Sequence, residues 1–251
     1  MWQTFNNAVT GEYLQYGQLF TQLQEALIGR LFLLVMTIIP CVFLLHYMVI
    51  GPKRFSHEGP QIFFFGLFSR IVHWVAAAAF SFLVLTGLMI IFAKPLGGGA
   101  FVMGGRSVHI VSAIIFTFSA IPMFLMWLKD MLPTLYDIKW FFIMGGYLSK
   151  EKMPVPAGKF NGGQKMWFWL VTLGGFVLAY SGYMLWALQG PVDTIRIMAI
   201  IHNLLAGALV AMFLTHLYMS IFAIAGSLTS MVTGYKPKEE VAILHSRYKE
   251  L

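Results

Sequence analysis

The chain has 251 residues, of which 59% are hydrophobic and only 11% are charged. This composition is too apolar for a soluble domain and is typical of a protein that crosses the membrane several times. The net charge is +7, and we expect no nucleic-acid partner. The single cysteine, Cys41, excludes a disulfide framework, a CxxCH haem site and a cysteine-ligated iron–sulfur cluster within the chain.

Five apolar stretches predict an all-α membrane protein, because each has roughly the 20 residues that cross about 30 Å of hydrocarbon. Before them, residues 1–27 form a polar segment whose helical period suggests a helix on the membrane surface. Residues 28–50 are an extra first transmembrane helix, residues 51–235 contain a bundle of four, and residues 236–251 form a charged tail. The five spans are expected at Ile28–Ile50, Ile71–Phe92, Val108–Leu128, Met166–Leu188 and Ile197–Leu228.

The placement of Lys and Arg predicts the orientation, because loops on the cytoplasmic side are enriched in positive charge. With the amino terminus outside, most of the 17 Lys and Arg residues fall on the inner side of the membrane. The outer side then holds only Arg30, Lys94, Arg106 and Arg196. We therefore expect the amino terminus outside and the carboxyl terminus in the cytoplasm.

Four histidines within the spans indicate a cofactor site. His202 and His216 lie 14 residues apart, which places them on one face of a helix and about 21 Å apart along it. Ionisable side chains in a span are costly, so a functional role is expected first. His109 opens the third span at the depth of His202, and His73 opens the second at the depth of His216. The sequence thus predicts two bis-histidine sites for two haems b, rather than four separate interfacial or hydrogen-bonded histidines.

Residues near these histidines fit the same interpretation. Arg70 and Arg106 each stand three residues before a histidine, where each could pair with a haem propionate or, alternatively, with lipid headgroups. Small residues such as Gly87 and Gly207 leave space for a porphyrin.

The remaining histidines are expected to lie outside the haem sites. His46 is in the first span and has no partner at its depth, so a satisfied, hydrogen-bonded side chain is expected. His57 and His245 lie in polar segments, where we expect them to be solvated.

The stretch from Arg70 to Lys236 resembles the gamma (cytochrome b) subunit of membrane-bound respiratory formate dehydrogenases. Four strings carry the resemblance: Arg70–Trp74, Gly105–His109, Gly158–Met166, and the paired motifs Ile201–His202 and Thr215–Met219. The family binds two haems b through four histidines in a bundle of four helices, which implies that residues 51–235 are a di-haem cytochrome b domain of the bacterial inner membrane. The matching ligands are His73, His109, His202 and His216.

The resemblance also implies partners and an electron path; the direction is left open, because a reversed flow from quinol to carbon dioxide would use the same residues. Electrons would come from an outer iron–sulfur beta subunit, itself served by a molybdenum or tungsten catalytic alpha subunit, and would pass through the two haems to menaquinone or another quinone near the cytoplasmic side. No catalytic residue for formate is expected in this chain. The extra first helix lies outside the resemblance and is a candidate for docking another subunit or another copy of the complex.

The resemblance also makes Asn161 and Gln164, with His216 of the nearby haem, the candidate quinone-binding residues. Amide groups can donate to and accept from a quinone oxygen. The alternative is that the Asn–Gly–Gly string turns the chain and caps the fourth span. Lys165 is expected to be an anchor at the membrane surface rather than a proton relay.

Three other functions remain as alternatives. The cytochrome b subunit of a nickel–iron hydrogenase or related dehydrogenase shares the histidine pattern, but the loop string at 158–166 argues against it. A haem-free membrane anchor would not need the four histidines. A transporter with histidine proton sites would need acidic residues at mid-membrane, and the five expected spans contain no Asp or Glu.

Overall fold

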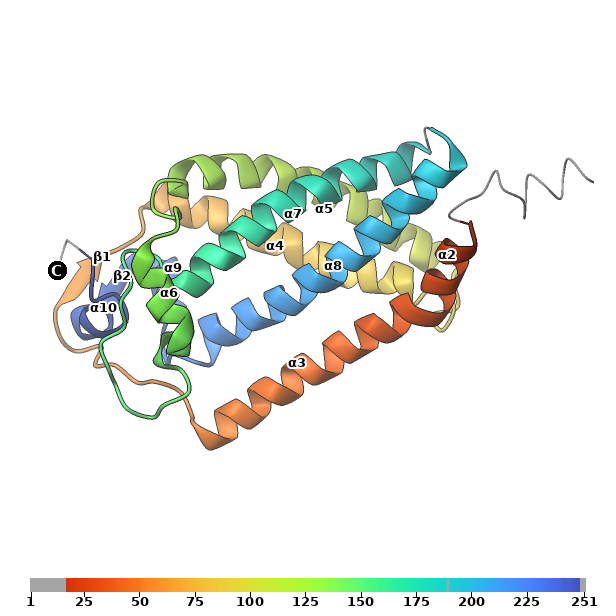
Figure 1. The fold of residues 1–251 in the computed structure, drawn as a ribbon. Helices are drawn as coiled ribbons and strands as arrows, with labels where there is room; N and C mark the ends of the chain where they lie inside the picture. Colours follow the sequence, from red (N-terminus) through yellow and green to blue (C-terminus); the bar gives the residue numbers. More distant parts are fainter. Residues whose placement is uncertain (1–16, 189, 249–251) are drawn as a thin grey trace, which may run out of the picture.

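The computed structural model describes residues 17–188 and 190–248, and most of them are helical (Figure 1). Within this part of the chain, five helices are long and apolar enough to cross a membrane. They are α3 (Gly29–Val49), α4 (Leu67–Ile91), α5 (Gly99–Trp127), α7 (Gly162–Ala187) and α8 (Val192–Ile221). The predicted all-α membrane protein with five spanning helices is confirmed.

The amino-terminal segment continues directly into the first span. The short helix α2 (Gly17–Gln22) and the π-helix η2 (Leu23–Ile28) lead into α3 without a break (Figure 1). The predicted surface helix falls partly on residues 1–16, which lie outside the described residues.

The third span begins earlier than the sequence suggested. Helix α5 starts at Gly99 rather than at Val108, so His109 lies well inside the helix instead of opening it. Gly105 lies inside this helix and is a packing residue: a Cβ on it would lie 2.9 Å from the Met89 side chain of α4. Glycine therefore permits close packing of two helices at this point.

The four spanning helices that follow α3 in the chain form two antiparallel hairpins, α4 with α5 and α7 with α8 (Figure 1). They meet in a core in which each helix contributes one aromatic ring. Phe80 of α4 lies 5.2 Å from Phe116 of α5, 5.1 Å from Phe213 of α8 and 5.8 Å from Trp167 of α7, measured between ring centroids. Helix α3 packs on the outside of α8.

One end of the bundle carries a folded cap, defined here as residues 51–66, 128–161 and 222–248. Strand β1 (Gln61–Phe63) pairs antiparallel with β2 (Tyr235–Pro237). The other elements of the cap are α6 (Leu135–Phe142), the 3-10 helix η3 (Met144–Gly146), α9 (Thr229–Thr233) and α10 (Lys238–Leu244). The fifth span consequently ends at Ile221 rather than Leu228, because the chain turns there to enter the cap.

The charged segment that begins at residue 236 is folded as far as it is described. Lys236 and Glu240 form a buried ion pair, and residues 243–247 exchange backbone hydrogen bonds with residues 155–157. The prediction of a solvated His245 is wrong: its side chain is buried, and its Nδ1 donates to the Gly158 carbonyl at 2.8 Å. Burial, with a smaller effect of the nearby Lys236 charge, lowers the pKa of His245 to about 3. The exposed His57 fits its prediction.

Candidate functional site

The four histidines predicted from depth lie in two facing pairs. His73 on α4 faces His216 on α8, and His109 on α5 faces His202 on the same α8. The ring centroids are 6.4 Å apart in each pair. We call the two ends of the bundle the His216 end, which carries the cap, and the His202 end.

The separation of the rings fits a shared iron. A metal–imidazole bond is about 2.0 Å long. The ring centre lies about 1 Å beyond the bonding nitrogen, so two imidazoles on opposite sides of one metal place their centroids roughly 6 Å apart. Both pairs have this spacing. The role of the four histidines as haem ligands stays a prediction.

Hydroxyl groups fix the histidines at the His202 end. Nδ1 of His109 lies 2.9 Å from the Thr86 hydroxyl, and Nδ1 of His202 lies 3.0 Å from the Ser181 hydroxyl. Each hydroxyl also donates to the carbonyl four residues earlier in its own helix, at 2.6 and 2.7 Å. Since a hydroxyl has a single proton, it accepts from Nδ1–H of the histidine. Nε2 of each ring is then unprotonated and available to a metal.

A glycine follows each hydroxyl residue and lies against the same ring. A Cβ on Gly87 would lie 3.5 Å from Cε1 of His109, and one on Gly182 would lie 3.2 Å from Cε1 of His202. Thr86–Gly87 on α4 and Ser181–Gly182 on α7 thus hold the histidine of the second helix in each hairpin. Gly87 was predicted from the sequence, but Gly182 and both hydroxyls were not, although a hydroxyl residue followed by glycine occurs in both helices.

The predicted role of Gly207 is wrong. A Cβ on it would meet the side chains of Leu31 and Phe32 of α3, at 3.5 and 3.7 Å, rather than a histidine. Gly207 therefore makes room for the first span and not for a porphyrin.

A large apolar cavity opens beside the pair at the His202 end. Its volume is about 440 Å³, and both His109 and His202 line it together with Gly87, Gly182 and Phe32. Pockets that hold a cofactor commonly have volumes of about 300–1,000 Å³ and apolar walls. The donor pair, the glycines and the cavity fit a haem.

Aromatic rings surround the pair at the His216 end. The ring of His216 stacks on Trp167 of α7, with centroids 5.4 Å apart and planes at 17°. His73 lies 6.5 Å from Trp127, also between centroids. Within the described residues, Nδ1 of His73 is buried without a hydrogen-bond partner. A buried polar atom left unpaired points to a missing ligand or water.

The two predicted propionate arginines lie in different settings. Arg70 donates from Nη1 to the carbonyl of Val232 in α9, while its Nε and the Ser69 hydroxyl are buried and unpaired within the described residues. These two groups lie about one turn before His73 and could donate to a carboxylate. Arg106 is exposed, and its role as a propionate ligand has no contact to support it.

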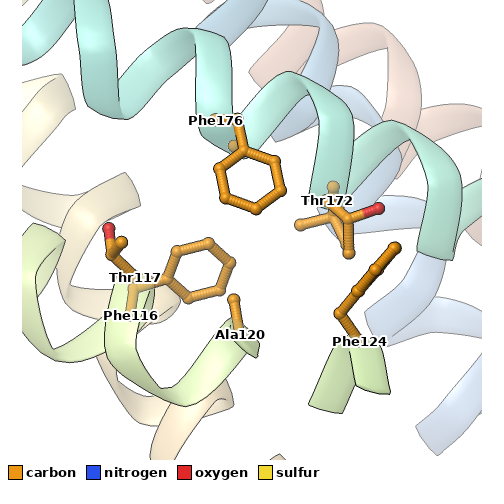
Figure 2. A pocket seen from close by; sticks show the side chains of 8 residues that line it. Phe116, Thr117, Ala120, Phe124, Thr172 and Phe176 are labelled. Carbon is orange, nitrogen blue, oxygen red and sulfur yellow. The ribbon is translucent and has the colours of Figure 1, made fainter. Parts of the chain in front are cut away.

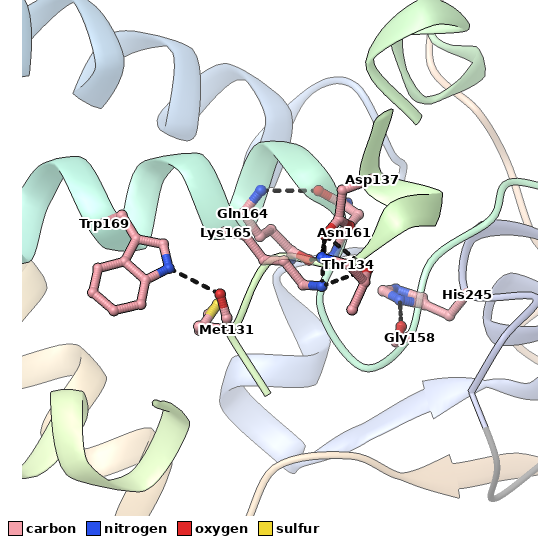
Figure 3. A network of polar contacts seen from close by, with 9 residues as sticks. All are labelled: Met131, Thr134, Asp137, Gly158, Asn161, Gln164, Lys165, Trp169 and His245. Carbon is pink, nitrogen blue, oxygen red and sulfur yellow. Dashed lines mark hydrogen bonds and ion pairs between the residues drawn. The ribbon is translucent and has the colours of Figure 1, made fainter. Parts of the chain in front are cut away.

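Asn161 and Gln164 form a capping box at the start of α7 (Figure 3). The backbone nitrogen of Gln164 donates to Asn161 Oδ1 at 2.9 Å, and the backbone nitrogen of Asn161 donates to Gln164 Oε1 at 3.0 Å. The side-chain oxygens of both residues therefore cap the helix, as the alternative to the quinone role predicted. Their side-chain NH₂ groups make no hydrogen bond within the described residues and remain available to a ligand.

Lys165 is buried rather than anchored at the surface. Its Nζ lies 2.9 Å from Oδ2 of Asp137, in the first turn of α6, and 3.3 Å from the hydroxyl of Thr134, the N-cap of α6 (Figure 3). The expected anchor role is wrong, because the ammonium is paired inside the cap instead of reaching the membrane surface. Asp137 Oδ1 is buried and has no partner among the described residues.

His46 fits its prediction of a satisfied side chain. Its Nε2 lies 2.8 Å from the Tyr147 carbonyl and its Nδ1 lies 2.5 Å from the Tyr218 hydroxyl.

A second cavity, between α5 and α7, is too small for a cofactor. Its volume is about 20 Å³, and Phe116, Thr117, Thr172 and Phe176 are among the residues that line it (Figure 2). It can hold about one water molecule.

A membrane-spanning four-helix core with two facing histidine pairs defines the class of b-type membrane cytochromes. A family model described as prokaryotic cytochrome b561 matches residues 65–234, and the chain belongs to this family. The match covers all four paired histidines and implies haem b. Helix α3 lies outside it.

The chain is also similar to subunits of formate dehydrogenases, which confirms the resemblance seen in the sequence strings. It is 27% identical over 194 residues to the cytochrome b556(Fdn) subunit of the nitrate-inducible formate dehydrogenase of Escherichia coli strain K12, covering 72% of this chain and 88% of the relative. The cytochrome b556 subunit of the Haemophilus influenzae formate dehydrogenase is 27% identical over 176 residues, covering 66% of this chain and 73% of the relative.

Proposed function

We propose that this chain is the membrane electron-transfer subunit of a formate dehydrogenase complex. The observation that carries the proposal is the pair of facing histidine sites at opposite ends of one membrane-spanning bundle. The names of its relatives support formate as the electron donor of the complex. The subunit would take part in an oxidoreductase complex without holding the formate active site itself.

Each histidine pair would hold one haem b: His73 with His216, and His109 with His202. When bound, the two haems supply one-electron redox chemistry at the two ends of the bundle. The chain itself orients the ligands. At the His202 end, the bond from Nδ1–H to a hydroxyl holds each ring and raises the basicity of its Nε2. At the His216 end, Trp167 holds the ring of His216 by stacking.

The orientation proposed from Lys and Arg puts the His202 end outside and the cap in the cytoplasm. An iron–sulfur subunit, linked to a molybdenum or tungsten subunit, would then dock at the His202 end. A quinone, menaquinone or another, would be reduced at the His216 end and would take its protons from the cytoplasm. Electrons moving inward and protons bound inside would together build a membrane potential, worth about 2.3 kcal/mol per charge for 100 mV.

The quinone site would lie at the start of α7. The capping box fixes the side chains of Asn161 and Gln164 while leaving both NH₂ groups as donors, which suits recognition of a quinone oxygen. Lys165 lies in this first turn of α7, and its ion-pair partner Asp137 comes from α6 and has an unpaired Oδ1 within the described residues. Protons could reach the quinone from these two groups.

An optical experiment tests the proposal. The purified complex is reduced with formate, and the reduced-minus-oxidised spectrum is recorded with pyridine haemochrome quantitation. We expect two haems b per chain, both reduced by formate and reoxidised by a quinone. Reduction by hydrogen but not by formate would instead identify a hydrogenase subunit, and a folded complex without haem would identify an anchor.

A further inference from the structure

Helix α3 and the π-helix η2 before it follow α8 from the His202 end to the His216 end (Figure 1). At the His202 end, the Asn203 side chain donates to Oε1 of Gln24 in η2 at 2.9 Å. At the other end, the Tyr218 hydroxyl meets His46 of α3 at 2.5 Å. Asn203 directly follows one paired histidine and Tyr218 lies two residues after another. The first span is therefore attached to α8 beside both histidine sites.

One turn at the junction of η2 and α3 is buried, in contrast to the rest of α3. Ile28 and Phe32 are 1% and 2% exposed, whereas Leu33, the next residue, is 56% exposed. The buried pair packs with Val84 and Leu88 of α4 and with residues of α8, so it lies between the two hairpins. Gly207 of α8 faces the same turn, because a Cβ on it would be in van der Waals contact with Leu31 and Phe32.

Phe32 also lines the cavity that contains His109 and His202. The Phe32 ring thus contacts side chains of α4 and α8 and also borders the cavity. The other residues that line this cavity come from α4, α5, α7 and α8. Through Phe32, the first span is the fifth helix that lines this cavity.

His46 makes the second attachment specific. The Tyr147 carbonyl can only accept, so Nε2–H of His46 donates to it at 2.8 Å and leaves Nδ1 to accept from the Tyr218 hydroxyl. Phe43, one turn earlier, stacks on the Tyr218 ring with centroids 4.3 Å apart. Three groups thereby fix α3 to α8 and to the cap near His216.

We propose that the first span forms part of the haem-binding core and does not serve only as a docking helix. Phe32 closes the His109–His202 haem cavity on the side of α3, and the contacts at Gln24, Gly207 and Tyr218 hold α8, the helix that carries one ligand of each pair, in position. The proposal rests on the proposed two-haem function. Its physical basis is that the apolar shell around a metal site controls solvent access and local dielectric, and through them the redox potential.

The test compares two adjacent positions of α3 in the whole complex. Phe32→Ala removes the ring and opens the cavity on the side of α3. Phe32→Leu removes the ring but keeps a large apolar side chain, which preserves folding. Leu33→Ala is the matched control on the exposed face of α3. The measurements are haem per chain, haem loss in detergent, and a redox titration followed by optical absorption. We expect both Phe32 variants to shift the midpoint of one haem only, and Phe32→Ala to lose that haem roughly tenfold faster. The control should match the wild type.

A parallel variant separates this proposal from the proposed function. His202→Ala should lose one haem. If it keeps both, the ligand assignment and the two-haem function fail. If His202→Ala loses a haem while the Phe32 variants match Leu33→Ala in midpoint and retention, the function stands and the role of α3 in the haem core is wrong. A shift in both midpoints would also contradict Phe32 as the wall of a single site.

Discussion

The two ends of the bundle reach the same ring separation, 6.4 Å, by different means. At the His202 end, two hydroxyls and two glycines hold the rings beside a cavity of about 440 Å³. At the His216 end, indole rings pack against the histidines, a folded cap covers them, and Nδ1 of His73 has no partner within the described residues. Hydrogen bonding orients one pair and packing orients the other, so the two sites should respond to different substitutions.

An apolar layer separates the two ends. Phe80 contacts an aromatic ring from each of the other three helices, and it lies along α4 between His73 and Thr86. This layer lies between two sites whose α8 histidines are about four helical turns apart. The difference between the ends can therefore persist within one bundle.

The largest effect is expected from the ligands on α8. His202→Ala and His216→Ala should each remove one of two haems b and leave the other, because the pairs share a helix but no residue. The measurement is pyridine haemochrome content together with the reduced spectrum of each variant. His57→Ala, at an exposed position, is the control. Two haems in either ligand variant would contradict the assignment.

Quinone reduction at the His216 end should be the next most sensitive property. Serine caps helices as well as asparagine does, so Asn161→Ser keeps the start of α7 but removes the free NH₂ donor. We expect quinone reduction to slow several-fold, since one hydrogen bond is worth about 1 kcal/mol, while formate still reduces both haems.

The matched variant is Asn161→Ala, which loses the cap as well and should also destabilise the helix start by about 1 kcal/mol. Steady-state quinone reduction and stopped-flow haem reduction distinguish the two roles. A normal quinone rate in Asn161→Ser would leave Asn161 as a helix cap only.

The spans and the histidine pairs could be predicted from the sequence because both depend on regular geometry. Length and apolarity determine a span, and a constant rise per residue gives the depth of His73, His109, His202 and His216. The pairing then follows without side-chain detail. The start of α5 was missed because glycines such as Gly105 also occur where helices pack closely.

The cap could not be predicted, because its contacts join segments far apart in the chain. His245 and Lys165 sit among polar neighbours, and local polarity suggests solvent or membrane surface. Their partners, Gly158 and Asp137, lie 87 and 28 residues away. The roles of Thr86 and Ser181 could not be predicted for a similar reason. Hydroxyls in membrane helices commonly bond to a carbonyl of their own helix, and only the position of the neighbouring helix shows that these two also contact a histidine.

A smaller effect is expected on the midpoint potentials of the two haems, and it should distinguish the two ends of the bundle. Thr86→Val and Ser181→Ala each remove the acceptor of a histidine Nδ1–H, which lowers the basicity of the ligand nitrogen. We expect the midpoint of the haem at the His202 end to rise by roughly 40 mV, the equivalent of about 1 kcal/mol for one electron. The other midpoint should not move.

The measurement is a redox titration of each variant in the whole complex. Thr37→Val removes a hydroxyl that bonds only to its own helix on the exposed side of α3, and it serves as the control. Equal shifts of both midpoints would show that the hydroxyls act on the bundle as a whole and not on one site.

The smallest effect concerns the cap and its dependence on pH. The pKa of His245 is about 3 in the folded chain, mainly because the ring is buried, against about 6.5 when unfolded. Between pH 6.5 and 3 the unfolded chain binds a proton that the folded chain does not, so the stability contributed by neutral His245 is complete above pH 6.5 and declines as the pH falls.

Thermal unfolding of the detergent-solubilised complex at pH 7.5 and pH 5 measures this decline. His245→Gln keeps a donor for the Gly158 carbonyl but does not titrate, so it should lose less stability at pH 5 than the wild type, whereas His57→Gln should lose as much. Because the cap covers only the His216 end, the absorption of that haem should change before the other on acidification. An equal decline in His245→Gln would mean that other groups determine the acid sensitivity of the cap.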